Sequence, residues 1–211
     1  MYANTDFLID LITILGICAF ALSAVLAARE KKADLFTVIV LGIVTAVGGG
    51  TVRDCILGVP MFWAEHTYFI WVAIVSSTIG FFFVPLLEKR FINKTNLYID
   101  SIALAMFSIQ ATDKAWSLDF GLPIAPILMG VMTGVGGGVI RDVLIQRPSL
   151  LLNKELYATP VALGCIIHAS VLYFAPELSD VSTLVAIGLI IYLRHLSISK
   201  QLQVPGWAIL K

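Results

Sequence analysis

The chain has 211 residues, of which 59% are hydrophobic and 13% are charged, and its formal net charge at pH 7 is zero. Soluble domains have about half apolar residues and about a quarter charged residues, so this composition excludes a soluble globular protein. Because the chain carries no excess of basic residues, we expect no nucleic-acid partner.

Long apolar stretches predict helices that cross a membrane. These stretches are continuous rather than alternating, which is typical of transmembrane helices and not of transmembrane strands. Spans of about 20 residues each fill the chain with seven crossings and short loops. In chain order, the predicted spans cover residues 7–27, 35–58, 67–87, 97–116, 121–146, 157–174 and 181–196. The predicted fold class is therefore an all-α polytopic membrane protein with seven transmembrane helices.

The second and fifth spans contain nearly the same motif, GGGTVRD at 48–54 and GGGVIRD at 136–142. The two motifs are 88 residues apart, and the same shift aligns Thr45 with Thr133. We therefore predict two copies of one three-helix unit. Because each unit has three spans, the second copy must enter the membrane from the opposite side, as in many transport proteins. The predicted units are a first repeat in 1–92, an inverted second repeat in 93–176, and a seventh helix with a short cytoplasmic tail in 177–211.

Basic residues in the loops predict the orientation of the chain. Short cytoplasmic segments carry an excess of Lys and Arg. With the N-terminus outside and the C-terminus in the cytoplasm, only Arg53 and Lys114 fall toward the outer side. The basic residues toward the cytoplasm are then Arg29, Lys31, Lys32, Lys89, Arg90, Lys94, Arg141, Arg147, Lys154, Arg194, Lys200 and Lys211.

The two glycine triplets predict weak points in the second and fifth spans. A helix from Leu35 to Val47 is about 20 Å long and must continue past the glycines to cross a core of about 30 Å. Each glycine costs roughly 1 kcal/mol relative to alanine in a helix. We therefore expect kinks or unwinding near mid-membrane, where freed carbonyls and helix ends form a pore. The glycines concerned are Gly48, Gly49, Gly50, Gly136, Gly137 and Gly138. The alternative is that small residues at four-residue spacing serve only close helix packing.

Charged residues follow each triplet. Arg53, Asp54, Arg141 and Asp142 lie at membrane depth, where a charge needs a partner or a cavity. Adjacent positions on a helix point about 100° apart, so we expect each arginine to pair with another span rather than with its own aspartate. Such pairs either lock the two repeats together or flank a water-filled path.

Several polar residues inside the spans are candidates for the lining of that path, although Ser and Thr often bond back to their own helix. The candidates are Ser23, Thr45, Ser101, Gln110 and Thr133. Asp10 and Asp100 occupy matched positions near the starts of two spans. His168 is interpreted as a satisfied core histidine rather than a proton relay.

The sequence lacks the common motifs of nucleotide-binding and hydrolytic enzymes. The G-x-G at 134–136 follows no strand, no lysine follows a glycine loop as in a nucleotide-binding P-loop, and H-E-x-x-H and G-x-S-x-G do not occur. We expect no enzyme activity, no cofactor and no tightly bound metal ion.

Two stretches, ALSAVLAAREKKADLFTVIVLGIVTAVGGGTVRDCILG and LMGVMTGVGGGVIRDVLIQRP, resemble the repeats of the trimeric intracellular cation (TRIC) channel family in its prokaryotic branch, also described as a glycine transporter domain. The resemblance implies a homotrimer with seven helices and a separate pore in each subunit. It also implies transient passage of monovalent cations, chiefly potassium, along kinked second and fifth spans. Lys114 matches the position of a lysine linked in the family to voltage-dependent block. The chain has no long charged C-terminal tail like that of the animal members, which indicates a prokaryotic cell membrane.

The functional prediction is a passive cation channel embedded among membrane lipids, with its pore between the second and fifth spans. Two alternatives remain open from the sequence. One is a secondary transporter of glycine or a similar small solute, because half-helix N-termini suit a carboxylate. The other is a structural membrane protein whose glycines serve assembly only.

Overall fold

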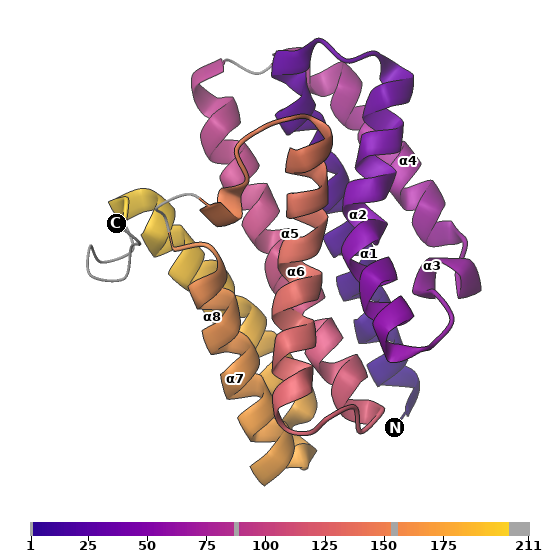
Figure 1. Ribbon diagram of the computed structural model, residues 1–211, viewed down its shortest axis with the longest axis vertical. Helices are drawn as coiled ribbons and strands as arrows, with labels where there is room; N and C mark the ends of the chain where they lie inside the picture. Colours follow the sequence, from indigo (N-terminus) through magenta and orange to yellow (C-terminus); the bar gives the residue numbers. More distant parts are fainter. Residues whose placement is uncertain (1, 87–88, 153–155, 203–211) are drawn as a thin grey trace.

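A computed structural model describes residues 2–86, 89–152 and 156–202, and these residues form a bundle of α-helices without strands (Figure 1). Short 3-10 turns, η1 to η4, occupy Arg29–Lys31, Val84–Leu86, Leu150–Leu152 and Pro176–Leu178. The α-helices are α1 (Tyr2–Ala28), α2 (Leu35–Leu57), α3 (Phe62–Glu65), α4 (Tyr68–Phe83), α5 (Lys89–Ser117), α6 (Ile124–Leu144), α7 (Ala158–Phe174) and α8 (Ser179–Lys200). The all-α fold class is confirmed.

Four helical segments are long and apolar enough to cross a bilayer by themselves: Ile9–Ala28, Leu35–Leu57, Ile124–Leu144 and Pro176–Lys200. The α4 and α7 helices are apolar but shorter, with 16 and 17 residues. The α5 helix has 29 residues and begins with the polar sequence KRFINKTN. Each predicted span thus has a helix, while the number of membrane crossings stays a prediction.

The long helices run alternately up and down in Figure 1, with α5 and α6 in the middle of the bundle. On one side of this central pair lie α1, α2 and α4, and on the other side lie α7 and α8. Local sequence fixes several of the helix ends. The Asp34 carboxylate caps α2 by accepting a hydrogen bond from the Thr37 N–H at 2.9 Å. Gly58 closes the same helix in the left-handed conformation, with φ of 68°.

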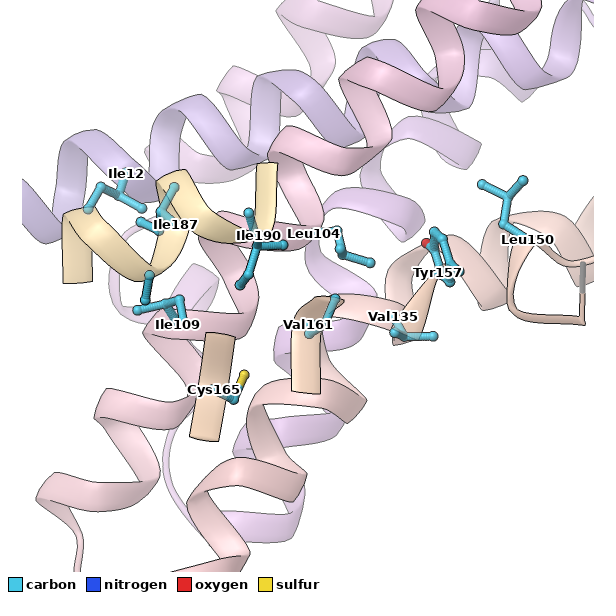
Figure 2. Close-up of a cluster of buried hydrophobic side chains, with 12 residues drawn as sticks. Ile12, Leu104, Ile109, Val135, Leu150, Tyr157, Val161, Cys165, Ile187 and Ile190 are labelled. Carbon is cyan, nitrogen blue, oxygen red and sulfur yellow. The ribbon is translucent and has the colours of Figure 1, made fainter. Parts of the chain in front are cut away.

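Apolar side chains fill the bundle in two main clusters on either side of α5. The first lies between α5, α6, α7 and α8 and includes Leu104, Val161 and Ile190 (Figure 2). The second joins α1, α2, α4 and α5, where the rings of Phe20 and Phe107 stack with centroids 5.4 Å apart. Large apolar side chains also cover the outside of the bundle, as the all-round hydrophobic helices of a membrane protein require.

Both glycine triplets lie inside continuous α-helix. The α2 helix continues through Gly48–Gly50 and the α6 helix through Gly136–Gly138. The predicted unwinding is therefore wrong, while a kink at the triplets stays a prediction. The physical reason is that the glycines supply close contact between the two helices, and this contact offsets their low helix propensity of roughly 1 kcal/mol per residue.

Candidate functional site

The α2 and α6 helices cross at the middle glycine of each triplet. A Cβ atom on Gly49 would collide with the backbone carbonyl of Thr133, and a Cβ atom on Gly137 would collide with the backbone carbonyl of Thr45. The two contacts are equivalent, because the two glycines are 88 residues apart and so are the two threonines. At this crossing the two backbones touch, and no side chain separates them.

The remaining triplet glycines also face neighbouring groups. Gly50 packs against the Phe62 ring, and a Cβ on Gly138 would lie 3.0 Å from the Tyr157 hydroxyl. A Cβ on Gly48 would lie 3.0 Å from the Ile140 side chain, and one on Gly136 would lie 3.5 Å from the Gly49 Cα. Glycine in both triplets therefore allows close approach, as the packing interpretation predicts.

The first arginine pair lies at the end of α2. Arg53 donates from Nε to Asp54 Oδ1 at 2.8 Å, and the Lys114 Nζ of α5 contacts the same oxygen at 2.9 Å. The other carboxylate oxygen accepts a hydrogen bond from the Phe62 N–H at 2.9 Å. Arg53 and Asp54 are buried, whereas the Lys114 side chain is 29% exposed. This group thus combines two cations and one carboxylate near the surface of the bundle.

The second arginine pair repeats this geometry on α6. Arg141 donates from Nε to Asp142 Oδ1 at 2.9 Å, and Asp142 Oδ2 accepts a hydrogen bond from the Leu150 N–H at 3.1 Å. Phe62 and Leu150 are again 88 residues apart. In both halves, therefore, the aspartate carboxylate binds the backbone of the turn eight residues further along the chain.

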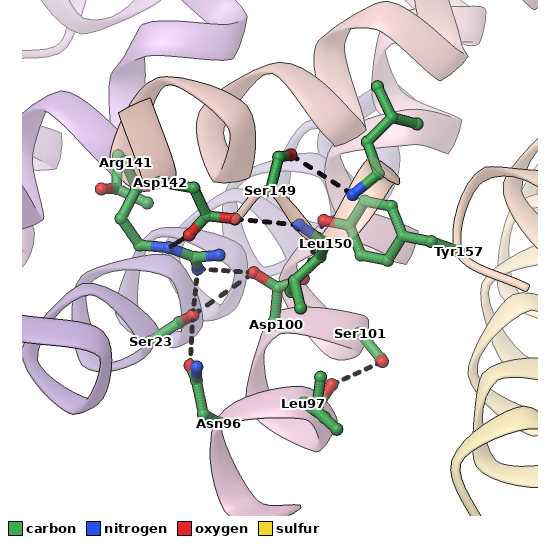
Figure 3. Close-up of polar contacts among 12 residues, drawn as sticks. Ser23, Asn96, Leu97, Asp100, Ser101, Arg141, Asp142, Ser149, Leu150 and Tyr157 are labelled. Carbon is green, nitrogen blue, oxygen red and sulfur yellow. Dashed lines mark hydrogen bonds and ion pairs between the residues drawn. The ribbon is translucent and has the colours of Figure 1, made fainter. Parts of the chain in front are cut away.

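Arg141 is fully buried, whereas the Arg53 side chain is 5% exposed. Figure 3 shows the partners of Arg141. Its Nη1 contacts Asp100 Oδ1 of α5 at 2.6 Å and also donates to the Ser23 hydroxyl of α1. Asp100 Oδ2 accepts a hydrogen bond from the Tyr157 hydroxyl at 2.8 Å. Ser23, Asp100 and Arg141 are fully buried. One guanidinium thus holds two carboxylates from two helices in a closed network.

The predicted pairing of the arginines is partly wrong. Each arginine binds the aspartate that follows it, because its long side chain folds back until Nε meets the neighbouring carboxylate. Pairing with other spans also occurs, in the contacts of Arg141 with Asp100 and of Lys114 with Asp54. The directions of the Cβ atoms do not decide the pairing, because an arginine side chain is long enough to reach the carboxylate of the next residue.

The five polar residues predicted to line a path have different hydrogen-bond partners. Thr45 and Ser101 donate to carbonyls of their own helices, at Leu41 and Leu97. Gln110 of α5 donates to the Ile9 carbonyl and the Thr13 hydroxyl of α1. The Thr133 hydroxyl is buried and has no hydrogen-bond partner in the part of the chain that the structure describes. Of the five, only Ser23 belongs to the Arg141 network.

His168 and Asp10 differ in their surroundings. The two ring nitrogens of the buried His168 contact Ser182 Oγ at 2.6 Å and Asp113 Oδ1 at 2.8 Å. The prediction of a satisfied core histidine is confirmed. Asp10 accepts a hydrogen bond from the Tyr68 hydroxyl at 3.1 Å and lacks the enclosure of Asp100.

Sequence reasoning missed the roles of Arg194 and Tyr157. Arg194 is predicted at a cytoplasmic end but is fully buried on α8, with its guanidinium 4.9 Å from the centre of the Tyr157 ring. Its apolar surroundings in the sequence, IIYLRHL, are the signal that places it inside the bundle. Tyr157 stands in ELYATP, which gives no comparable indication.

A cavity of about 600 Å³ opens where α1 ends, α2 begins and α6 ends. Lys31, Thr37 and Gln146 give it polar groups, and the rest of its lining is apolar. It lies at the end of α2 opposite Arg53. Among the described residues, no group of three His, Cys, Asp or Glu side chains is placed to hold a metal ion.

Comparison with known proteins identifies the family. The model of the glycine transporter family matches residues 10–85 and 97–173, which fall within the two predicted repeats. The chain is 37% identical over 198 residues to the inner membrane protein YadS of Escherichia coli K12, covering 93% of this chain and 94% of YadS. It is 42% identical over 161 residues to the membrane protein YvgT of Bacillus subtilis, covering 75% and 78% of the two chains. Both relatives carry the family designation UPF0126.

Solved structures give the same assignment. The TRIC channel orthologue from Rhodobacter sphaeroides superimposes with a TM-score of 0.85 at 28% identity, covering 92% of this chain and 99% of that one. A prokaryotic TRIC channel crystallised in 0.5 M KCl superimposes with a TM-score of 0.86 at 30% identity, covering 97% and 100%. The chain therefore belongs to the glycine transporter (UPF0126) family of membrane proteins and to the prokaryotic branch of the TRIC channel family.

Proposed function

We propose that this protein is a passive channel for monovalent cations, chiefly potassium, with a pore in each subunit of a homotrimer. The observation that carries the proposal is the similarity to prokaryotic TRIC channels over nearly the whole of both chains. The Rhodobacter sphaeroides protein is an orthologue of the trimeric intracellular cation channels, and this relation supports a trimer here.

The α2 and α6 helices are the proposed walls of the pore. They touch at Gly49 and Gly137, and a cavity opens between the start of α2 and the end of α6. In this proposal the contact at the glycine crossing is the point that closes the ion path. Opening requires the two backbones to separate there, after which carbonyl oxygens near the triplets can replace part of the water shell of an ion.

The arginine groups flank this path at its two ends. Arg53, Asp54 and Lys114 stand at the proposed outer end, and Arg141 and Asp142 stand toward the proposed inner end. Charges at such positions adjust the local ion concentration and the barrier to passage. Ser23, Thr45, Ser101, Gln110 and Thr133 remain proposed as polar groups that an open conformation exposes.

The proposed location is the inner (cell) membrane of a prokaryote, with the N-terminus outside and the C-terminus in the cytoplasm. The description of YadS as an inner membrane protein supports the location. The matched contacts of Gly49 with Thr133 and of Gly137 with Thr45 support two repeats of opposite orientation. The excess of basic residues toward one side supports the direction of insertion.

The test is a recording from purified protein in a planar bilayer under a potassium chloride gradient. A channel gives discrete current steps that reverse near the potassium equilibrium potential. If the protein is pure and trimeric but never gives such steps, the channel proposal is wrong.

A transporter of glycine or a similar small solute is the second candidate, because the family is described as glycine transporter. Proteoliposomes loaded with buffer and supplied with labelled glycine test this alternative. Saturable uptake without current steps favours a transporter. Steps without saturable uptake favour the channel.

A further inference from the structure

Arg194 of α8 is fully buried, and its guanidinium has partners on α5 and at the start of α7. Its Nε donates to the Ser101 hydroxyl at 3.1 Å, and its Nη1 donates to the Leu156 carbonyl at 2.8 Å. The guanidinium also lies over the Tyr157 ring, 4.9 Å from the centroid. A buried arginine in a membrane helix is costly, so its position marks a specific role rather than general packing.

Tyr157 connects this arginine to the candidate site. The residue stands at the N-cap of α7 and is 3% exposed. One face of its ring meets Arg194, while its hydroxyl donates to Asp100 at 2.8 Å. The other oxygen of Asp100 binds Arg141 (Figure 3). A single side chain therefore lies between a guanidinium on α8 and the network on α6.

The first half of the chain has a different arrangement. There, Asp54 accepts a hydrogen bond from Lys114, a partly exposed side chain of α5, and from the Phe62 N–H. Among the residues that the structure describes, α8 provides no hydrogen bond or ion pair to Asp54. The two arginine groups, although alike in their backbone geometry, are thus fixed by different elements. Of these two groups, the described residues connect the Arg141 group alone to α8, through Tyr157.

We propose that α8 controls the Arg141 end of the conduction path, with Arg194 and Tyr157 as positioning residues that hold Asp100 and, through it, Arg141. The proposal rests on the channel function proposed above. Withdrawal of Arg194 frees the Tyr157 ring, weakens the hydrogen bond of its hydroxyl to Asp100, and loosens the hold on Arg141. The hydrogen-bond network around Arg141 then breaks more readily, and the channel opens more often.

Single-channel recording of variants tests this control. Tyr157→Phe removes one hydroxyl, and Arg194→Gln removes the charge over the ring. Each is expected to raise the open probability by roughly 2- to 30-fold, the range of coupling measured along packed networks, without changing the unitary conductance. The double variant is expected to equal the larger single effect, because both changes break one connection. Arg194→Lys, which keeps the charge, should restore part of the wild-type gating.

Thr78→Val on α4 is the control, since the Thr78 hydroxyl bonds within its own helix, at the Ile74 carbonyl. If Arg194→Gln fails to assemble as the wild type does in size-exclusion chromatography, Tyr157→Phe and Arg194→Lys carry the test. If the wild type conducts but Tyr157→Phe leaves the open probability unchanged or lowers it, the inference about α8 is wrong and the channel function still stands. A silent wild type overturns the channel function itself.

Discussion

Arg53 and Arg141 each bind the aspartate that follows them, and they differ in what surrounds the pair. The Arg141 group contains one guanidinium and two carboxylates, all buried, whereas the Asp54 group contains one carboxylate and two cations. Removing one partner of a buried ion pair leaves an uncompensated charge in a medium that solvates it poorly. The two arginines should therefore differ in how much the fold depends on them.

Arg141→Leu leaves Asp100 and Asp142 buried without their guanidinium. We expect a loss of about 3–5 kcal/mol, the usual cost of breaking a buried ion pair, and hence a lower melting temperature in detergent. Arg53→Leu is the matched control and should cost less, because Asp54 keeps Lys114. Equal melting temperatures for the two variants would contradict this account.

Lys114 is 29% exposed, and without it Asp54 still keeps Arg53 and the Phe62 N–H. We therefore expect Lys114→Gln to cost less than the roughly 3–5 kcal/mol of breaking a buried ion pair, because the buried carboxylate is not left without a cation. If Lys114 has the role that its position in the family implies, the same variant should weaken voltage-dependent block. Recording current against voltage, together with the melting temperature, separates the two effects. If Lys114→Gln greatly lowers the melting temperature and leaves the voltage-dependent block unaltered, Lys114 serves stability and not block.

At the scale of the helices, the crossing of α2 and α6 depends on the absence of side chains at Gly49 and Gly137. Gly49→Ala places a Cβ against the Thr133 backbone, which has no flexible end that can move aside. We expect this overpacking to cost about 1–3 kcal/mol, measured by thermal unfolding of the purified protein.

Gly188→Ala on α8 is the control, because a Cβ there meets nothing within 4 Å. That variant should be neutral or stabilising by up to about 1 kcal/mol, the difference in helix propensity. Gly49→Ala and Gly137→Ala should also be non-additive, since each pushes apart the same pair of helices. A Gly49→Ala protein as stable as Gly188→Ala would disprove the backbone contact.

The same crossing shows how far the sequence predicts the fold. Long apolar runs predicted the helices well, because burial in lipid leaves few other arrangements of the backbone. The doubled motif located both arginine pairs, but it did not predict which group Gly49 contacts. That group is the backbone of Thr133 on another helix, and a single sequence does not show which helices cross or at which residue. The burial of Arg194 was missed for the same reason, since its partners come from α5 and the N-cap of α7.

At the scale of the whole molecule, the predicted orientation can be tested with single cysteines. Leu118 directly follows α5, Ser199 lies in the last turn of α8, and both are exposed. The C-terminal ends of α5 and α8 lie at opposite ends of the bundle (Figure 1). In a variant without Cys18, Cys55 and Cys165, we expect Leu118→Cys to react with a membrane-impermeant maleimide in intact cells. Ser199→Cys should react only after the cells are opened. The reverse pattern would mean that the N-terminus faces the cytoplasm.

The carboxylates of Asp54 and Asp142 each bind a backbone N–H eight positions downstream. This hydrogen bond fixes the number of residues between the aspartate and the N–H. An added residue would move the N–H away from the carboxylate oxygen, and that oxygen cannot follow because the arginine holds the same carboxylate. Segments 55–61 and 143–149 should therefore tolerate no insertion or deletion, and relatives that differ in size should differ elsewhere.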